Sequence, residues 1–221
     1  MKPRSRFSNP SLSTPEGIVA LGGPIDASEL LDSYRYGVFP WPIEGLPLTW
    51  FCPPLRGILE FKNLHFSRSF ERFQRKTSLS VTFDTAFQEV IQLCATTIRA
   101  QEEEASSWIT PELLAAYIEL HKLGHAHSVE VWDSEHKLVG GLYGVDLYGV
   151  FSAESMFRLT PNASKLALHA LVEQLKKTGT TWIDVQALNP FTESLGAHEI
   201  PRSKYLDRLA HTPHMKRWPS N

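Results

Sequence analysis

The segment from residue 140 to residue 186 places acidic and amide side chains inside apolar strands, which few folds tolerate. Two apolar strands lead into a helix that begins near Asn162, and the helix leads into a third strand. Glu154 lies in the second strand, and Asp184 and Gln186 lie in the third. Burying a carboxylate or an amide without partners costs several kcal/mol. The three side chains therefore indicate either a satisfied polar network or a reaction site.

The strands around this segment predict the fold class. Residues 128–132 and 137–140 alternate between apolar and polar side chains, and together with residues 148–156 they indicate an antiparallel meander. Helical segments come before these strands, and a helix and a last strand come after them. This order predicts an α+β fold with a mixed, mostly antiparallel sheet, similar to the GNAT acetyltransferase core.

The strand that contains Glu154 has a period of two. This period predicts that Ser152, Glu154 and Met156 point to one face of the sheet. In the preceding strand, Gly140, Gly141 and Gly144 would weaken an ordinary ladder, so they indicate a bulge or the close approach of a ligand.

Composition limits the class of protein. The 221 residues are 42% hydrophobic and 21% charged, which is typical of a soluble protein with a real core. The proline-rich start suggests a small N-terminal domain, residues 1–57, before a second domain, residues 58–221. With a net charge of −2, any RNA-binding surface has to be a local patch. Cys52 and Cys94 lack metal or disulfide spacing, and no apolar run reaches the ~20 residues of a membrane span, so we expect a cytoplasmic protein.

A basic helix is predicted between residues 66 and 76. Phenylalanines recur at helical spacing along it, so one of its faces is buried. Its cationic side chains share another face and are Arg68, Arg72, Arg75 and Lys76. Such a face is either simply solvated or binds phosphate, because arginine forks match phosphate oxygens.

The histidines do not predict a metal site. His125 and His127 lie two residues apart without nearby carboxylates or cysteines, which is typical of the start of a strand. Asp84 and Asn162 each precede a helical segment, and we expect both side chains to cap those helices.

Several chemistries lack their motifs. There is no Gly-x-Ser-x-Gly elbow around Ser155, no Walker loop and no Gly-x-Gly-x-x-Gly fingerprint. A CoA-binding enzyme of the GNAT fold normally has a glycine-containing turn between the central strand and the next helix, whereas residues 157–164 contain no glycine. The sequence therefore predicts a GNAT-like fold that lacks the usual CoA-binding turn.

Motifs spread along the chain match a known family in order. They are Phe39–Trp41, Trp108–Thr110, Gly124–Trp132, Gly140–Val145, Glu154–Phe157, Asn162–Lys165, Ile183–Gln186, Ser194–Ala197 and Ile200–Arg202. On these motifs, from Leu21 to Leu206, the chain resembles the leucyl/phenylalanyl-tRNA–protein transferase family.

The resemblance implies an aminoacyltransferase that moves Leu or Phe, and less readily Met, from aminoacyl-tRNA to proteins beginning with Arg or Lys. The product would be marked for degradation through the N-end rule pathway. The implied fold is a small N-terminal domain plus a GNAT-like C-terminal domain. The implied partners are aminoacyl-tRNA and protein substrates, with no cofactor, no metal and no membrane, and we expect a monomer.

The resemblance also implies the site residues. Glu154, Asp184 and Gln186 would be catalytic, with Glu154 attracting the cationic substrate. Asp184 would polarise Gln186, whose carbonyl oxygen accepts the amine proton, or the two residues would position the amine while its proton passes through substrate or water. The aminoacyl side-chain pocket would be formed by Leu142, Phe151, Met156 and Leu171. The terminal adenosine would lie between Trp41 and Trp108. The tRNA acceptor stem would meet Arg68, Arg72, Arg75 and Lys76.

Two other functions stay open. A CoA-dependent N-acyltransferase of the same fold would bind acetyl-CoA tightly. A non-catalytic module that binds tRNA or N-degrons would keep its binding after Glu154→Ala or Gln186→Ala and would transfer nothing.

Overall fold

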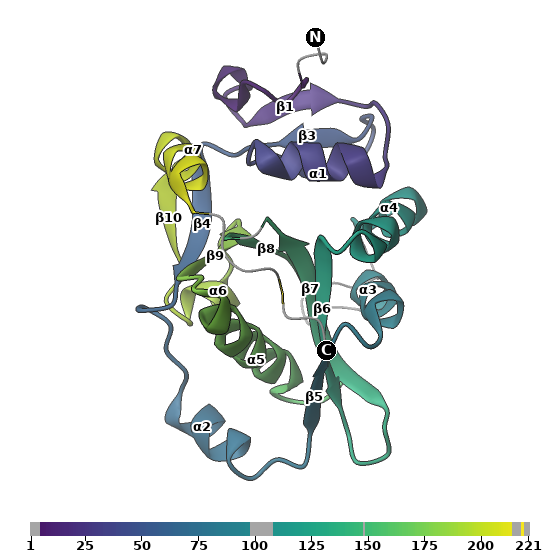
Figure 1. Ribbon diagram of the computed structural model, residues 1–221, viewed down its shortest axis with the longest axis vertical. Coiled ribbons are helices and arrows are strands. Elements are labelled where there is room, and N and C mark those ends of the chain that lie inside the picture. Colours follow the sequence, from purple (N-terminus) through teal and green to yellow (C-terminus); the bar gives the residue numbers. More distant parts are fainter. Residues whose placement is uncertain (1–4, 98–107, 148, 214–217, 219–221) are drawn as a thin grey trace.

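The computed structural model describes residues 5–97, 108–147, 149–213 and residue 218. The chain forms a small N-terminal lobe and a larger lobe built on one long sheet (Figure 1). The small lobe contains a three-stranded sheet in the order β1-β3-β2. Its elements are η1 (Pro10–Leu12), β1 (Ile18–Leu21), α1 (Ala27–Arg35), β2 (Phe39–Pro40) and β3 (Thr49–Phe51).

Local sequence signals define both ends of α1. The Asp26 side chain accepts a hydrogen bond from the main-chain N–H of Glu29 at 2.9 Å and caps the helix. Gly37 follows the helix with a φ of 73°, a left-handed conformation that a glycine adopts without strain. The turn at Gly37 directs the chain into β2, at the boundary between the two lobes.

The larger lobe confirms the predicted fold class. Its seven-stranded sheet has the order β10-β4-β9-β8-β7-β6-β5. Among the strands that the structure describes in this sheet, β8 and β9 form the one parallel pair, with Ser152 opposite Asp184, and α5 connects them. The strands are β4 (Leu55–Glu60), β5 (Ser80–Phe83), β6 (Ala126–Trp132), β7 (Leu138–Asp146), β8 (Phe151–Arg158), β9 (Trp182–Gln186) and β10 (His198–Pro201).

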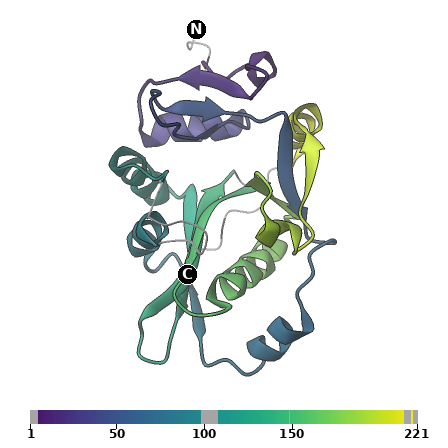
Figure 2. The ribbon, with the colours of Figure 1, turned by 180° about the vertical axis from the view of Figure 1, so that it is seen from behind.

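Helices cover both faces of the sheet (Figures 1 and 2). Helix α5 packs on one face over an apolar cluster that includes Leu171, and α3 and α4 pack on the other face. The helices are α2 (Arg68–Gln74), α3 (Phe87–Thr96), α4 (Pro111–Lys122), α5 (Ala163–Thr178), α6 (Pro190–Glu193) and α7 (Arg202–His211). No helix in the described part of the chain is long and apolar enough to cross a membrane.

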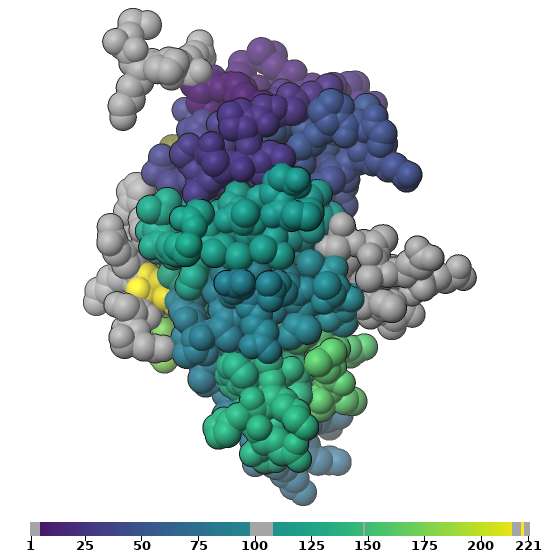
Figure 3. All heavy atoms as spheres, turned by 90° about the vertical axis from the view of Figure 1, so that its right-hand side faces the viewer, coloured from purple at the N-terminus to yellow at the C-terminus, as the bar shows by residue number. Residues whose placement is uncertain are grey.

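The small lobe sits directly on α4. The space-filling view shows these two parts in continuous contact (Figure 3). Leu30 and Tyr34 of α1 belong to the same buried cluster as Leu113 and Tyr117 of α4. Because the hydrophobic core continues from one lobe into the other, the position of the small lobe is fixed against the sheet.

The predicted period of two along β8 is wrong at its centre. Tyr143 pairs with Ser155 and Gly144 pairs with Ala153, so Glu154 has no opposite residue and forms a bulge. An extra residue in one strand shifts the phase of the side chains that follow it. Met156 therefore packs on the α5 face together with Phe151, and not on the face of Ser152 and Glu154.

The glycines of β7 serve the bulge and close packing within the chain. A Cβ atom at Gly144 would lie 2.3 Å from the Ser152 carbonyl oxygen, and one at Gly140 would lie 2.5 Å from Ala163 Cβ. The first contact is with the main chain beside the bulge and the second is with the first turn of α5. These positions require glycine because neighbouring segments of the chain approach there.

The lobes meet near the predicted domain boundary. The three-stranded sheet ends at Phe51, and β4 enters the long sheet at Leu55. We retain the division into residues 1–57 and 58–221 as a proposal, with β4 as the element that crosses it.

Candidate active site

Asp184 lies in the middle of β9, and donors surround its carboxylate. Arg56 donates from Nε to Oδ1 at 2.8 Å and from Nη2 to Oδ2 at 2.6 Å. Oδ2 also accepts from the hydroxyls of Tyr205 at 2.9 Å and Ser152 at 3.1 Å. Oδ1 accepts from the main-chain N–H of Gln186 at 2.9 Å. Because Asp184 is 0% exposed, a guanidinium and not water balances its charge.

Arg56 is the site residue that the sequence analysis missed. Its side chain is 1% exposed at the start of β4, and Nη1 donates to the Gly37 carbonyl oxygen at 3.2 Å. The rings of Phe39 and Tyr205 lie 4.5 and 4.4 Å from its guanidinium carbon. One side chain thus joins the small lobe, the long sheet and α7. The available signal was a lone arginine inside a mostly apolar strand.

Glu154 lies at the bulge in β8 and has fewer partners. Its Oε1 accepts from Gln186 Nε2 at 2.8 Å, and its Oε2 accepts from the Tyr117 hydroxyl at 3.2 Å. The Tyr117 hydroxyl is 2.6 Å from that of Tyr34. Burial raises the pKa of Glu154 to about 7 and the charge of Asp184 adds to this, while the hydrogen bonds of Tyr34, Gln186 and Tyr117 oppose the rise. The carboxyl group therefore gains and loses a proton near neutral pH.

Gln186 has a left-handed main chain, with a φ of 61°. This conformation costs a residue other than glycine on the order of 1–3 kcal/mol, so the surrounding contacts have to maintain it. Asp184 does so through the main-chain N–H of Gln186, while the side-chain amide donates to Glu154. Asp184 therefore contacts the main chain of Gln186, whereas the sequence indicated a contact with its side-chain amide.

The residues expected to hold the aminoacyl side chain belong to one apolar cluster between the sheet and α5. They are Leu142, Phe151, Met156 and Leu171. Met156 is half-buried, and the other three are at most 1% exposed. Trp218 stacks on Phe151 with ring centroids 5.8 Å apart, a contact that the sequence did not predict. Any side chain that enters this cluster has to displace packed side chains or pass beside Met156.

The two tryptophans expected to flank an adenosine stack on each other. The ring centroids of Trp41 and Trp108 are 6.3 Å apart, with an angle of 21° between the planes. Trp41 is 41% exposed, and Trp108 also touches Tyr117 edge-on. Exposed aromatic faces stack on bases without sequence preference. Tyr117 also donates to Glu154, so it connects the two tryptophans to the Glu154 carboxylate.

The expected basic helix is α2, which begins after Ser67. The Ser67 side chain accepts from the main-chain N–H of Phe70 at 3.3 Å, and Phe70 is buried. The cations on its other side are all exposed and are Arg68, Arg72, Arg75 and Lys76. Arg72 and Lys76 line a shallow surface hollow. Helix α2 lies at the end of the molecule opposite the small lobe (Figures 1 and 2), so these cations do not contact Glu154.

Two family models cover most of the chain. The model of the leucyl/phenylalanyl-tRNA protein transferase matches residues 58–210, and the model of the N-terminal domain of that transferase matches residues 23–54. The chain belongs to this family. The family predicted from the sequence motifs is thereby confirmed, and with it the enzyme class, an aminoacyltransferase.

Family members from two bacteria show how much of the chain is shared. The leucyl/phenylalanyl-tRNA–protein transferase of Pseudoalteromonas atlantica is 46% identical over 90% of this chain and 83% of its own length. That of Maridesulfovibrio salexigens is 46% identical over 92% of this chain and 84% of its own length.

Solved structures of other proteins show weaker likeness. A tandem GNAT protein from the clavulanic acid biosynthesis pathway matches 95% of this chain and 63% of its own, with a TM-score of 0.38 and 11% identity. The structure of AAC(6')-Iy in complex with a bisubstrate analogue matches 66% of this chain and 97% of its own, with a TM-score of 0.34 and 11% identity.

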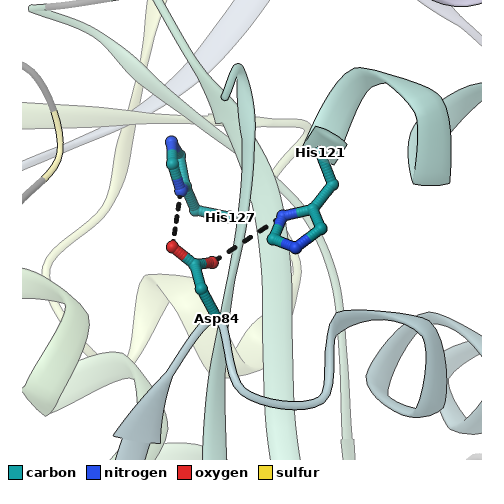
Figure 4. Close-up of side chains that lie close together, drawn as sticks. All are labelled: Asp84, His121 and His127. Carbon is teal, nitrogen blue, oxygen red and sulfur yellow. Dashed lines mark hydrogen bonds and ion pairs between the residues drawn. The ribbon is translucent and has the colours of Figure 1, made fainter. Parts of the chain in front are cut away.

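Asp84, His121 and His127 form a second polar cluster (Figure 4). They have the spacing of a metal site, which the sequence did not reveal because the three are far apart in the chain. His127 Nδ1 lies 2.8 Å from Asp84 Oδ2, and His121 Nδ1 donates to the Ala126 carbonyl oxygen at 2.7 Å. Each facing nitrogen already has a protein partner, so a metal ion would have to replace both bonds.

The capping expectations at two helices are wrong. Asp84 accepts from the main-chain N–H of Ser128 at 2.9 Å and binds His127, while Ala86 occupies the N-cap position of α3. Asn162 does occupy the N-cap position of α5, but it makes no capping hydrogen bond and its φ is 67°. The Asp84 carboxylate is therefore held by Ser128 and His127, which are distant in the sequence, and it does not cap α3.

Proposed function

We propose that this chain transfers Leu or Phe, and less readily Met, from aminoacyl-tRNA to proteins that begin with Arg or Lys. The product carries a new peptide bond and is marked for degradation through the N-end rule pathway. Family membership supports the reaction class. The observation that carries the proposal is the half-buried carboxylate of Glu154, bonded to Gln186 and placed beside the charge-paired Asp184.

The chemistry of the substrates fits this site. The ester of an aminoacyl-tRNA is already activated, so transfer requires neither ATP nor CoA. The enzyme has to hold the amine against the ester carbonyl and accept its proton. Glu154 provides the negative charge that attracts either the N-terminal ammonium or the basic side chain of the acceptor. Gln186, fixed to Glu154, is placed to orient the amine.

The tRNA is proposed to span the molecule. Its acceptor stem meets the exposed cations of α2, whose guanidinium groups suit phosphates. Its terminal adenosine stacks on Trp41 and Trp108, next to Tyr117 and the Glu154 site. The transferred side chain enters the cluster that contains Phe151 and Met156. We place the reaction in the cytoplasm, where the free thiols of the two cysteines stay reduced.

The test is the transfer of radiolabelled Leu from Leu-tRNA to peptides that begin with Arg, Lys, Asp or Ala. We expect transfer to the Arg and Lys peptides alone. Gln186→Ala lowers it, whereas Gln92→Ala, an exposed glutamine of α3, leaves it unchanged. Transfer to no peptide, with intact tRNA binding, would overturn the proposal and leave a binding module. Transfer from acetyl-CoA instead would identify a CoA-dependent acyltransferase.

A further inference from the structure

We infer that the two carboxylates of the site divide the work: Arg56 holds Asp184 as a fixed anchor for Gln186, and Glu154 accepts the proton of the attacking ammonium. This inference rests on the proposed function and names the roles within it. It makes Arg56 and Asp184 positioning residues, and it makes Glu154 the catalytic base.

The hydrogen bonds of Asp184 leave it no capacity for a substrate proton. An ionised carboxylate has about four lone-pair sites. Asp184 already accepts five hydrogen bonds, two of them from Arg56 and the others from Ser152, Tyr205 and the main chain of Gln186. Its side chain is 0% exposed. A proton on Asp184 would leave the guanidinium of Arg56, which cannot lose its own proton, buried without a counter-charge.

The same bonds show what Asp184 positions. It lies two residues before Gln186 and accepts the main-chain N–H of that residue, which stabilises a φ of 61°. Arg56 fixes the Asp184 carboxylate through Nη2, and it donates from Nη1 to the Gly37 carbonyl oxygen of the small lobe. Since Gln186 donates to Glu154, the orientation of Glu154 depends on this chain of contacts.

Glu154 has the properties that Asp184 lacks. It is half-buried, so an acceptor amine can reach it, and no cationic side chain forms an ion pair with it in the described part of the chain. The groups that face it are Tyr117 of α4, Tyr34 of α1, and Gln186 and Asp184 of β9. Burial raises its pKa to about 7, which suits a base that works near neutral pH.

The proposed step balances in atoms and charge. The ammonium of the acceptor gives one proton to Glu154, and the freed amine attacks the carbonyl carbon of the ester. A C–N bond forms, and the bond between that carbon and the ribose oxygen breaks. A second proton of the nitrogen ends on the ribose oxygen, so the tRNA leaves as an alcohol. Glu154 then returns its proton to water.

The first experiment measures transfer to an Arg peptide as a function of pH. The wild type should show an acidic limb in kcat with an apparent pKa near 7. Glu154→Gln should lower kcat by roughly 10²-fold or more and change the KM of the peptide little, as the loss of a proton acceptor does. If Glu154→Gln raises the KM of the peptide and leaves kcat unchanged, Glu154 only attracts the substrate, and the inference is overturned.

The second variant removes the anchor without leaving a buried charge. Arg56→Met/Asp184→Leu replaces the pair by apolar side chains of similar volume, which proteins often tolerate. We expect kcat to fall by roughly 10- to 10²-fold because Gln186 is misplaced, with the acidic limb retained. Loss of the limb would identify Asp184 as the base and overturn the inference. Arg208→Met, which removes a partly exposed ion pair with Glu60, is the control and leaves kcat unchanged.

A titration followed by NMR does not require an active enzyme, so it tests the inference even if a variant transfers no Leu. Carboxyl carbon NMR should show one carboxyl group that titrates near pH 7 in the wild type and in Arg56→Met/Asp184→Leu but not in Glu154→Gln. The opposite pattern would overturn the inference. If the wild type transfers no Leu at all, the proposed function fails. If it transfers Leu but the titration belongs to Asp184, only the division of roles fails.

Discussion

Arg56 and Asp184 are 128 residues apart in the sequence and form a two-point ion pair, with Nε 2.8 Å from Oδ1 and Nη2 2.6 Å from Oδ2. Both side chains are at most 1% exposed. Burying two charges costs several kcal/mol per ion, and a paired geometry with further hydrogen bonds offsets that cost. The pair therefore fixes geometry more than it adds stability.

The first prediction concerns the stability of this pair. Arg56→Met should lower the free energy of unfolding by about 3–5 kcal/mol, because it leaves the buried Asp184 charge uncompensated. Arg56→Met/Asp184→Leu should be much closer to the wild type. Urea unfolding at neutral pH measures both. A double variant that is no more stable than the single one would show that the two side chains do not act as a pair.

The second prediction follows from the raised pKa of Glu154, about 7 against a usual 4.5. The folded state holds this proton more tightly than the unfolded state does. The contribution to stability is therefore complete below pH 4.5 and is lost as the pH rises through 7. The free energy of unfolding of the wild type, minus that of Glu154→Gln, should fall between pH 5 and 7 and level off above. Urea unfolding across this range checks it, and a constant difference would contradict it.

The third prediction concerns the basic face of α2. If Arg72 binds a tRNA phosphate, Arg72→Ala should weaken binding of every tRNA alike and reduce the salt slope of log K by about 0.7–0.9. Lys122→Ala, at the exposed end of α4, is the matched loss of one charge and should leave the slope unchanged. Filter binding at several salt concentrations measures both. Equal slopes for Arg72→Ala and the wild type would mean that this face is simply solvated.

The fourth prediction concerns the apolar cluster at Phe151. Met156 is its most exposed member among the four expected pocket residues. Met156→Ala should enlarge the space and shift the ratio of kcat/KM from Leu-tRNA toward Phe-tRNA by roughly tenfold, since a change of methylene size is worth about 1–3 kcal/mol. Leu159→Ala removes an exposed side chain just beyond the same strand and is the control. An unchanged ratio in Met156→Ala would place the pocket elsewhere.

The fifth prediction concerns Asp84, His121 and His127. Both imidazole nitrogens near Asp84 already contact protein oxygens, so the cluster is stable without an ion. Prolonged treatment with a chelator should leave Leu transfer unchanged within twofold. Activity that disappears with chelation and returns with a divalent metal would show that the cluster is a metal site.

Short-range patterns were sufficient for much of the fold and for finding three residues of the candidate site. Apolar alternation and helix signals predicted the α+β class, and polar residues inside apolar strands identified Glu154, Asp184 and Gln186. The period of two failed at Glu154 because a bulge is an extra residue relative to a neighbouring strand, and a single strand carries no record of its partner's register.

The sequence by itself determined strands β6 to β9, the helix that connects β8 to β9, and the presence of Glu154 and Asp184 inside two of these strands, because apolar alternation and helix signals depend on residues close together in the chain. Tertiary structure alone decided which carboxylate is neutralised. Arg56 reaches Asp184 only when β4 lies beside β9, and Tyr117 reaches Glu154 only when α4 packs on the sheet. Tyr34 reaches Tyr117 only when the small lobe packs on α4. Charge pairing and burial depend on distance in space, and they place two chemically similar side chains in different surroundings.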